Sequence, residues 1–277
     1  MPELPEVETV VRDLRPHVVG RTIVGATVRW QRTIATPSAR EFARQIRGLK
    51  VIALTRRGKH LVFQLCKGAR CRTPTAYLLV HLRMTGGFSI DPPEMPRDKH
   101  VHVLFKLDDG HEVRFRDTRK FGRMWLVDDP ARVTAKLGPE PLEISVKEFA
   151  ARFERRRGHL KPLLLDQTFV AGLGNIYVDE SLWYARLHPL RAAETLTRAE
   201  RGRLFRAIQR VLTRAIAVGG TSIDVMYKRV NGASGGFQDS LRAFDREKRP
   251  CRRCGTPIQK TVVGQRGTHF CPKCQLP

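Results

Sequence analysis

The sequence lacks any run of apolar residues long enough to cross a membrane. Its amino terminus carries Glu3, Glu6 and Glu8, where a secretory signal would have a basic block followed by an apolar one. Both absences argue against a membrane or secreted protein. We therefore expect a soluble, cytoplasmic chain with no membrane partner.

Acidic residues are also scarce, because 27 Asp and Glu stand against 51 Lys and Arg, which gives a net charge of +24. Much of the excess is arginine, whose planar guanidinium presents a fork of donors to phosphate. The composition predicts a polyanionic partner whose binding weakens as salt is added. Taken alone, it leaves DNA, RNA and an acidic membrane surface open.

Only six cysteines are present, and four of them form two C-x-x-C pairs separated by sixteen residues. This spacing is typical of a zinc ion held by four thiolates, with no open position for chemistry. We predict one structural Zn²⁺ bound by Cys251, Cys254, Cys271 and Cys274, and two disulfides are the alternative in an oxidising compartment. Cys66 and Cys71 are interpreted as ordinary free thiols.

The first residues suggest a nucleophile beside an acid. Removal of Met1 would leave the secondary amine of Pro2 at the chain terminus, with Glu3 and Glu6 close behind it. A terminal amine has a pKa of about 7.7–8.0 against about 10.4 for lysine, so far more of it is neutral at pH 7. Attack on a sugar aldehyde carbon would give an iminium that favours elimination at neighbouring carbons. The alternative is that the glutamates only favour a helix start.

The hydrophobic pattern predicts an α+β protein. Apolar residues from Val7 to Val18 recur at helical spacing, so a first helix should begin near Pro5 or Glu6. Residues 22–127 show short runs of period two, with a hairpin signal at Asp109-Gly110, and predict a β-sandwich or flattened barrel.

The second half of the chain reads as helical. Capping boxes begin at Ser145 and Thr197, and Gly219-Gly220 should end the second of these helices. A 277-residue chain favours more than one domain. We expect a catalytic sheet domain at 1–130, a linker at 131–144, a helical domain at 145–240 and a zinc finger at 241–277.

Several short motifs occur together along the whole chain. They are Met1-Pro2-Glu3-Leu4-Pro5-Glu6-Val7-Glu8, Arg57-Gly58-Lys59, His81-Leu82-Arg83-Met84, Asp117-Thr118-Arg119-Lys120-Phe121-Gly122, Gly172-Leu173-Gly174-Asn175-Ile176-Tyr177 and the two cysteine pairs. In this order they resemble the formamidopyrimidine-DNA glycosylase family. The resemblance implies a helix-two-turns-helix element in the helical domain. It also implies a bacterial, monomeric, nucleoid-associated enzyme of base-excision repair that excises oxidised purines from duplex DNA, acts at abasic sites and cuts the strand by β- and δ-elimination.

The resemblance also implies roles for individual residues. Pro2 would be the nucleophile at C1′ of the damaged nucleotide, Glu3 its proton-transfer partner, and Lys59 a phosphate contact that contributes to catalysis. Glu6 would be a helix-start group that helps to position the terminus beside the DNA. The DNA-binding residues would be Glu6, His81, Met84, Arg119, Phe121, Lys161, Asn175 and Arg266.

The contacts divide by task. Met84 would fill the gap left by an everted nucleotide, Phe121 would intercalate beside the opposite base, and Arg119 would bind the orphaned cytosine. Core packing is the plainer interpretation of Met84 and Phe121. The helix start at Asn175, together with Lys161 and Arg266, would bind phosphates, whereas a simple turn at 171–175 and a basic surface at Arg266 are the alternatives.

Two departures leave alternatives open. The interior of the segment 221–237 differs from the family's lesion-capping loop, and Ala243-Phe244-Asp245-Arg246 replaces the usual tyrosine-glycine-arginine. A pyrimidine-preferring, endonuclease VIII-like branch is disfavoured by Leu4, where glycine is usual. A zinc-containing damaged-DNA-binding protein without activity would follow if Met1 were retained.

Overall fold

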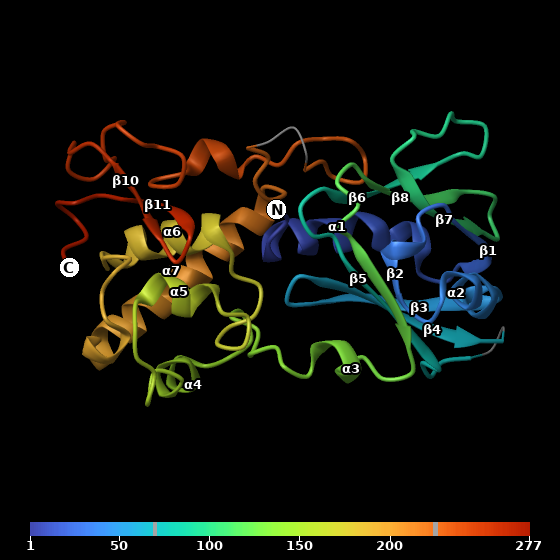
Figure 1. Cartoon of the computed structure of the whole chain (residues 1–277), viewed down its shortest axis with the longest axis horizontal. Coiled ribbons are helices and arrows are strands. Elements are labelled where there is room, and N and C mark those ends of the chain that lie inside the picture. The colour runs from blue at the N-terminus through green and yellow to red at the C-terminus, as the bar shows by residue number, and fades with distance from the viewer. Residues whose placement is uncertain (69–70, 224–226) are drawn as a thin grey trace. The chain divides into compact units, whose positions relative to one another are not determined.

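The computed structural model describes residues 1–68, 71–223 and 227–277. It divides into two compact units (Figure 1). Unit 1 comprises residues 1–135 and 219–235, and unit 2 comprises residues 136–218 and 236–277. No helix in the described part of the chain is both long and apolar enough to cross a membrane.

Unit 1 begins with the predicted helix, α1 (Leu4–Val18). Pro5 stands in its first turn, where a helix needs no internal N–H bond, so proline is tolerated there. The apolar stripe is fully buried and packs into the core of the unit, which fixes the helix start on a rigid support. The stripe consists of Val7, Val10, Val11, Leu14 and Val18.

A nine-stranded sheet follows, in the order β2-β9-β5-β4-β3-β1-β7-β8-β6. The strands are β1 (Thr22–Val28), β2 (Ile34–Thr36), β3 (Leu49–Arg57), β4 (His60–Lys67), β5 (Ala76–His81), β6 (Gly86–Asp91), β7 (Val101–Leu107), β8 (Glu112–Asp117) and β9 (Arg123–Val127). Neighbours pair antiparallel except β2 and β9, which are parallel. The hairpin predicted at Asp109-Gly110 joins β7 to β8, as expected.

The sheet folds over on itself into two layers. Phe63 on β4 contacts Phe88 on β6 edge to face, although β3, β1, β7 and β8 separate these strands in the sheet order. Side chains from both halves of the sheet line one apolar interior, among them Leu78 and Val113. The predicted α+β class with a two-layered sheet is therefore confirmed. Short elements complete the unit: η1 (Gln31–Thr33), α2 (Ala39–Ile46) and α3 (Ala131–Thr134).

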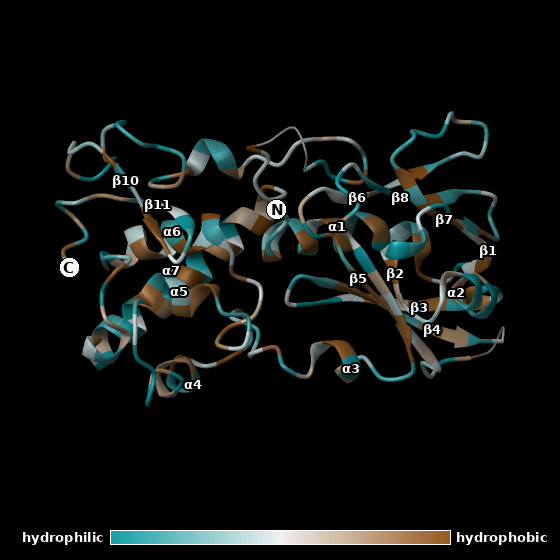
Figure 2. Cartoon of the chain, viewed as in Figure 1, coloured by the Kyte–Doolittle hydropathy of each residue, from teal (hydrophilic) through white to brown (hydrophobic). Residues whose placement is uncertain are grey.

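Unit 2 is built from short helices and one hairpin. Its elements are α4 (Val146–Ala151), α5 (Leu160–Leu165), α6 (Asn175–Ala185), η2 (Ala193–Thr195), α7 (Arg198–Ala217), η3 (Phe237–Ser240), β10 (Gln259–Val263) and β11 (Arg266–Phe270). Both predicted capping boxes are present, at Ser145 and Thr197. Figure 2 shows hydrophobic, brown stretches along the strands of the sheet and in α5. In this unit the rings of Phe149, Phe153, Phe169 and Phe205 are buried and pack against one another.

The segment 219–235 returns to unit 1 after α7 ends. Tyr227 joins the apolar core of the sheet, and its hydroxyl donates to the backbone carbonyls of Glu6 and Gly219. The predicted boundaries group this segment with the helical domain, whereas its contacts group it with the sheet. The capping boxes reveal where helices start, but they carry no information about the return of a later loop to an earlier helix.

Candidate functional site

The amino-terminal residues are buried rather than loose. Pro2 and Glu3 are both covered, and Glu3 is only 3% exposed. In the described chain Met1 precedes Pro2 and is 43% exposed. Cleavage of that one exposed residue would convert the nitrogen of Pro2 from an amide into a secondary amine at a fixed position.

Glu6 holds this start of the chain. The backbone N–H of Glu3 donates to Glu6 Oε2 at 2.8 Å, and the backbone N–H of Thr221 donates to Glu6 Oε1 at 2.7 Å. Gly220 has a φ of +80°, and a Cβ there would lie 2.7 Å from Glu6 Oε1, so the close approach requires glycine. One buried carboxylate thus ties the candidate nucleophile's neighbour to a segment 215 residues away.

A second tie joins the same segment to α1. Arg229 forms a bidentate ion pair with Asp13, with N–O distances of 2.7 and 3.1 Å. Together with the Tyr227 hydroxyl, this pair fixes the part of 219–235 that follows residue 226. The sequence departures at 224–226 lie outside the described residues.

Lys59 occupies the two-residue turn between β3 and β4, where Arg57 pairs with His60. It is only 6% exposed, which rules out a solvated hairpin tip. The turn also meets His81, because His60 and His81 pair across β4 and β5 and their rings lie edge to face at 4.7 Å. The structure therefore brings two of the predicted residues, Lys59 and His81, to one place.

His60 on β4 and His81 on β5 are both neutral at pH 7. Burial lowers the pKa of His60 to about 4, with further lowering by Arg83 and Arg57. Burial and the neighbouring His60 lower the pKa of His81 to about 2. His81 Nδ1 accepts a hydrogen bond from the backbone N–H of Arg83 at 2.9 Å, which leaves its other nitrogen as the donor. A neutral imidazole in this state can still donate to phosphate.

The predicted wedge residues lie on two adjacent turns, 82–85 and 118–122. Buried Asp117 joins the turns, since its carboxylate accepts from the Thr85 hydroxyl, from the Arg119 N–H at 3.2 Å and from the Gly122 N–H at 2.7 Å. Motif matching alone assigned Asp117 no role. Its signal in the sequence was weak, because an acid at the end of a strand is common.

Solvent exposure distinguishes the predicted wedge residues from residues of the apolar core. Phe121 is 48% exposed, and the Arg119 guanidinium stacks over its ring at 4.8 Å. Met84 is half-buried on a turn in which Arg83 adopts a left-handed φ of 56°. The core interpretation of Phe121 is therefore excluded in this unit.

In unit 2 the predicted phosphate residues differ from one another. Asn175 begins α6, whose N-cap Gly174 supplies no side-chain cap, and its Nδ2 donates to the Gly267 carbonyl at 3.0 Å. Arg266, one residue earlier on β11, is exposed. Lys161 is completely buried and contacts Asp179 Oδ1 at 2.6 Å. The geometry thus leaves Asn175 and Arg266 available to a ligand, whereas Lys161 lies inside the protein.

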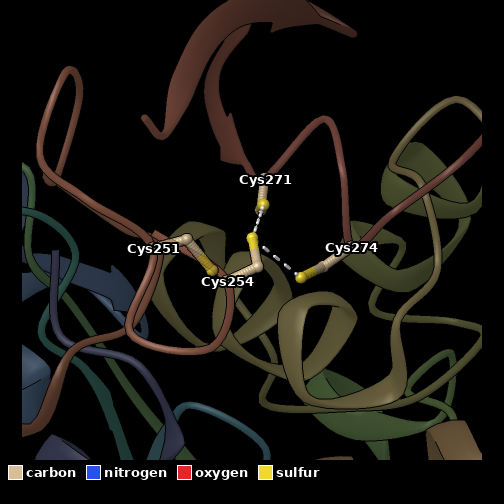
Figure 3. A group of neighbouring side chains, drawn as sticks. All are labelled: Cys251, Cys254, Cys271 and Cys274. Atoms are coloured by element: carbon tan, nitrogen blue, oxygen red, sulfur yellow. Dashed lines mark hydrogen bonds between the residues drawn. The ribbon is translucent and has the colours of Figure 1, made fainter. Parts of the chain in front are cut away.

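The four paired cysteines converge at one point (Figure 3). Their sulfurs all lie within 4.8 Å of one another, with Cys254 at 3.5 Å from Cys271 and 3.4 Å from Cys274. Zn–S bonds of about 2.3 Å in a tetrahedron place sulfurs about 3.8 Å apart, so the cluster fits one zinc ion. All four thiols are free, which excludes the disulfide alternative in this structure. Trp183 Nε1 donates to Cys251 Sγ at 3.4 Å and orients that ligand.

Comparison with known proteins decides the family. Three family descriptions match in succession: the formamidopyrimidine-DNA glycosylase N-terminal domain over residues 1–124, the formamidopyrimidine-DNA glycosylase H2TH domain over 137–227, and the zinc finger found in FPG and IleRS over 249–276. The chain belongs to the formamidopyrimidine-DNA glycosylase family. The resemblance drawn from the short motifs is therefore confirmed.

Full-length relatives agree with this assignment. The formamidopyrimidine-DNA glycosylase of Herpetosiphon aurantiacus is 46% identical over 99% of this chain and 100% of its own length. The solved complex of MutM with carbocyclic 8-oxo-G containing DNA has a TM-score of 0.90 and 37% identity, and covers both chains completely. The complex of Lactococcus lactis Fpg with abasic-site DNA has a TM-score of 0.89 and 36% identity over 99% of this chain and all of that one.

Proposed function

We propose that this protein is a bifunctional DNA glycosylase and abasic-site lyase that excises 8-oxoguanine and formamidopyrimidines from duplex DNA. Three features support the proposal: the matched family over nearly the whole chain, the net charge of +24, and the zinc-finger hairpin. The enzyme would act as a monomer in the cytoplasm, on the DNA of the nucleoid.

The observation that carries the mechanism is the burial of Pro2 and Glu3 at the start of α1, where Glu6 holds the Glu3 N–H. After removal of Met1, the neutral Pro2 amine attacks C1′, the bond from C1′ to the damaged base breaks with its electron pair on the base, and the proton lost by the Pro2 nitrogen neutralises the departing base. Glu3 delivers a proton to the sugar ring oxygen, and the ring opens to an iminium. The iminium makes the C2′ proton acidic, so its removal expels the 3′ phosphate, and a second elimination expels the 5′ phosphate.

Unit 1 would also hold the lesion. Lys59, in the turn before β4, lies near neutral His81, which pairs with His60 across β4 and β5, and the two residues would bind the phosphates next to the damaged nucleotide. Met84 would occupy the vacated stack, while Phe121 and Arg119 would meet the opposite strand and its cytosine. Exposure of Phe121 beside the Arg119 guanidinium supports this role.

Unit 2 would bind the backbone of the same duplex. The start of α6 at Asn175 offers amide donors and the positive end of the helix dipole, and exposed Arg266 adds a guanidinium on β11. Lys161 would act on phosphate only indirectly, because it is completely buried.

Covalent trapping tests the proposal. Borohydride should reduce the iminium to a stable protein–DNA adduct with 8-oxoguanine opposite cytosine, and the Pro2→Gly variant should trap far less. Mass spectrometry of the same preparation must show that Met1 has been removed. Lack of an adduct from processed protein, or an undiminished adduct from Pro2→Gly, would refute the role of Pro2.

Two controls separate the remaining alternatives. Duplex carrying thymine glycol tests the pyrimidine-preferring branch, against which the exposed Phe121 and the stacked Arg119 argue. Tight binding to damaged duplex without any adduct would instead identify a non-catalytic damage-binding protein.

A further inference from the structure

The zinc-finger hairpin is anchored to the helical body by a completely buried ion pair. Lys161 on α5 and Asp179 on α6 have no exposed surface, and their N–O distance is 2.6 Å. The second carboxylate oxygen of Asp179 accepts the backbone N–H of His269 on β11 at 2.9 Å. One carboxylate therefore joins two helices and the hairpin.

Lys161 also contacts the hairpin strand directly, at the Gly267 carbonyl. Lys161 Nζ donates to the Gly267 carbonyl at 3.0 Å, and Asn175 Nδ2 donates to that same carbonyl at 3.0 Å. These contacts hold the backbone on both sides of Thr268, immediately after exposed Arg266. Asn175 keeps one amide hydrogen for a ligand, because Nδ2 has two.

We propose that Asp179 is a positioning residue: through Lys161 and the backbone of residues 267–269, it holds Arg266 and Asn175 in register for one stretch of phosphate backbone. This inference rests on the proposed function and deepens it. It reassigns Lys161 from a phosphate contact to a support of that contact.

Stability alone is a weak reason for this arrangement. A buried ion pair often stabilises a protein no more than well-packed apolar side chains of the same volume would. What the charged pair adds is directed contacts with the hairpin. Lys161 Nζ also donates to the Gly267 carbonyl and Asp179 also accepts the His269 N–H, and both of these contacts lie on the strand that carries Arg266. A two-stranded hairpin has little stability of its own, so its position must come from such contacts.

The test is a double-mutant cycle between Asp179→Asn and Arg266→Ala. Each protein is titrated, over a series of salt concentrations, with a duplex that contains a stable tetrahydrofuran analogue of an abasic site. We expect Asp179→Asn to weaken binding about tenfold and to lower the salt slope by about one, as Arg266→Ala does. In the Arg266→Ala background, Asp179→Asn should cost less than about twofold, because the group through which it acts is already missing.

A second variant guards against simple unfolding. Lys161→Met with Asp179→Leu removes both charges and should keep the wild-type melting temperature and zinc content, yet remain several-fold weaker in DNA binding. The proposal is overturned if the losses of DNA affinity in Asp179→Asn and Arg266→Ala multiply in the double variant. It is also overturned if the apolar pair has both the stability and the DNA affinity of the wild-type protein. Borohydride trapping by the wild-type protein is measured alongside, so that failure of the glycosylase function is distinguished from failure of the positioning role.

Discussion

Each of the two units contains a buried carboxylate that joins distant segments of the chain, but the surrounding structure differs. In unit 1, Glu6 accepts the N–H groups of Glu3 and Thr221; in unit 2, Asp179 binds the ammonium of Lys161 and the N–H of His269. Each buried carboxylate joins chain segments that are far apart in sequence. Glu6 rests on a helix packed into a nine-stranded sheet, whereas Asp179 supports a two-stranded hairpin next to a metal site. An ion pair and a metal site can therefore hold a small element in place where a large apolar core is missing.

Removal of zinc should break this comparison most strongly. Without the metal the four thiolates have no common partner, and small zinc-held elements lose their fold. We expect Cys271→Ser to abolish zinc binding and to weaken duplex affinity by about two orders of magnitude, because the hairpin's fold and its phosphate contact are lost together. Zinc content by metal analysis and affinity by titration check this.

The matched control for zinc removal is Cys66→Ser. Cys66 is buried on β4, in the unit that lacks the metal site. This variant should keep its zinc and its DNA affinity, and calorimetry should show that the melting of unit 1 survives in Cys271→Ser. Full duplex affinity in a Cys271→Ser protein that contains no zinc would show that the hairpin does not contribute to DNA binding.

Glu6→Gln tests the corresponding carboxylate of unit 1. An amide offers one acceptor where the carboxylate serves two N–H donors, so one buried N–H loses its partner at a cost of roughly 1–3 kcal/mol. We expect the unfolding free energy to fall by this amount and the rate of adduct formation to fall several-fold, while affinity for a tetrahydrofuran duplex changes little. Chemical denaturation and single-turnover trapping measure the two effects.

Glu8→Gln provides the comparison for Glu6. Glu8 lies on the same helix but pairs with the side chains of Arg12 and Arg56 instead of backbone amides. Its substitution should cost less than that of Glu6, because Arg12 is exposed and the Arg56 guanidinium keeps its hydrogen bond to the Gly58 carbonyl. Equal losses of trapping rate in the two variants would contradict a special role for Glu6 at the amino terminus.

Whether a feature could be predicted from the sequence depends on how far apart in the sequence its interacting residues lie. The capping boxes at Ser145 and Thr197, the hairpin at 109–110 and the cysteine cluster depend on residues close in sequence or on a fixed spacing, and each was predicted. The family motifs supplied the rest of the candidate site. The return of 219–235 to α1 and the burial of Lys161 were missed, because each depends on a partner far along the chain that no local pattern marks.

The smallest expected effect is a difference between the two units in how their stability depends on pH. Burial lowers the pKa of His60 in unit 1 to about 4, whereas burial raises the pKa of Glu180 in unit 2 to about 7. Below the unfolded histidine pKa of about 6.5, the unfolded chain gains a proton that folded His60 refuses, so unit 1 loses stability as pH falls from about 6.5 toward about 4. Glu180 has the opposite sign: its contribution is lost as pH rises from about 4.5 to about 7.

His60→Phe should therefore reduce the difference between the melting temperatures of unit 1 at about pH 8 and about pH 5 by a few degrees. Phenylalanine keeps the aromatic contacts with His81 and Trp125, and any lost hydrogen bond acts at both pH values and cancels in the difference. The positive side chains of Arg57, Lys59 and Arg83 surround the pair and oppose protonation at every pH in this range. The wild-type protein, melted at the same two pH values, gives the reference difference. If His60→Phe leaves that difference unaltered, the acid sensitivity of unit 1 must arise at other groups, of which His81 is the first to test.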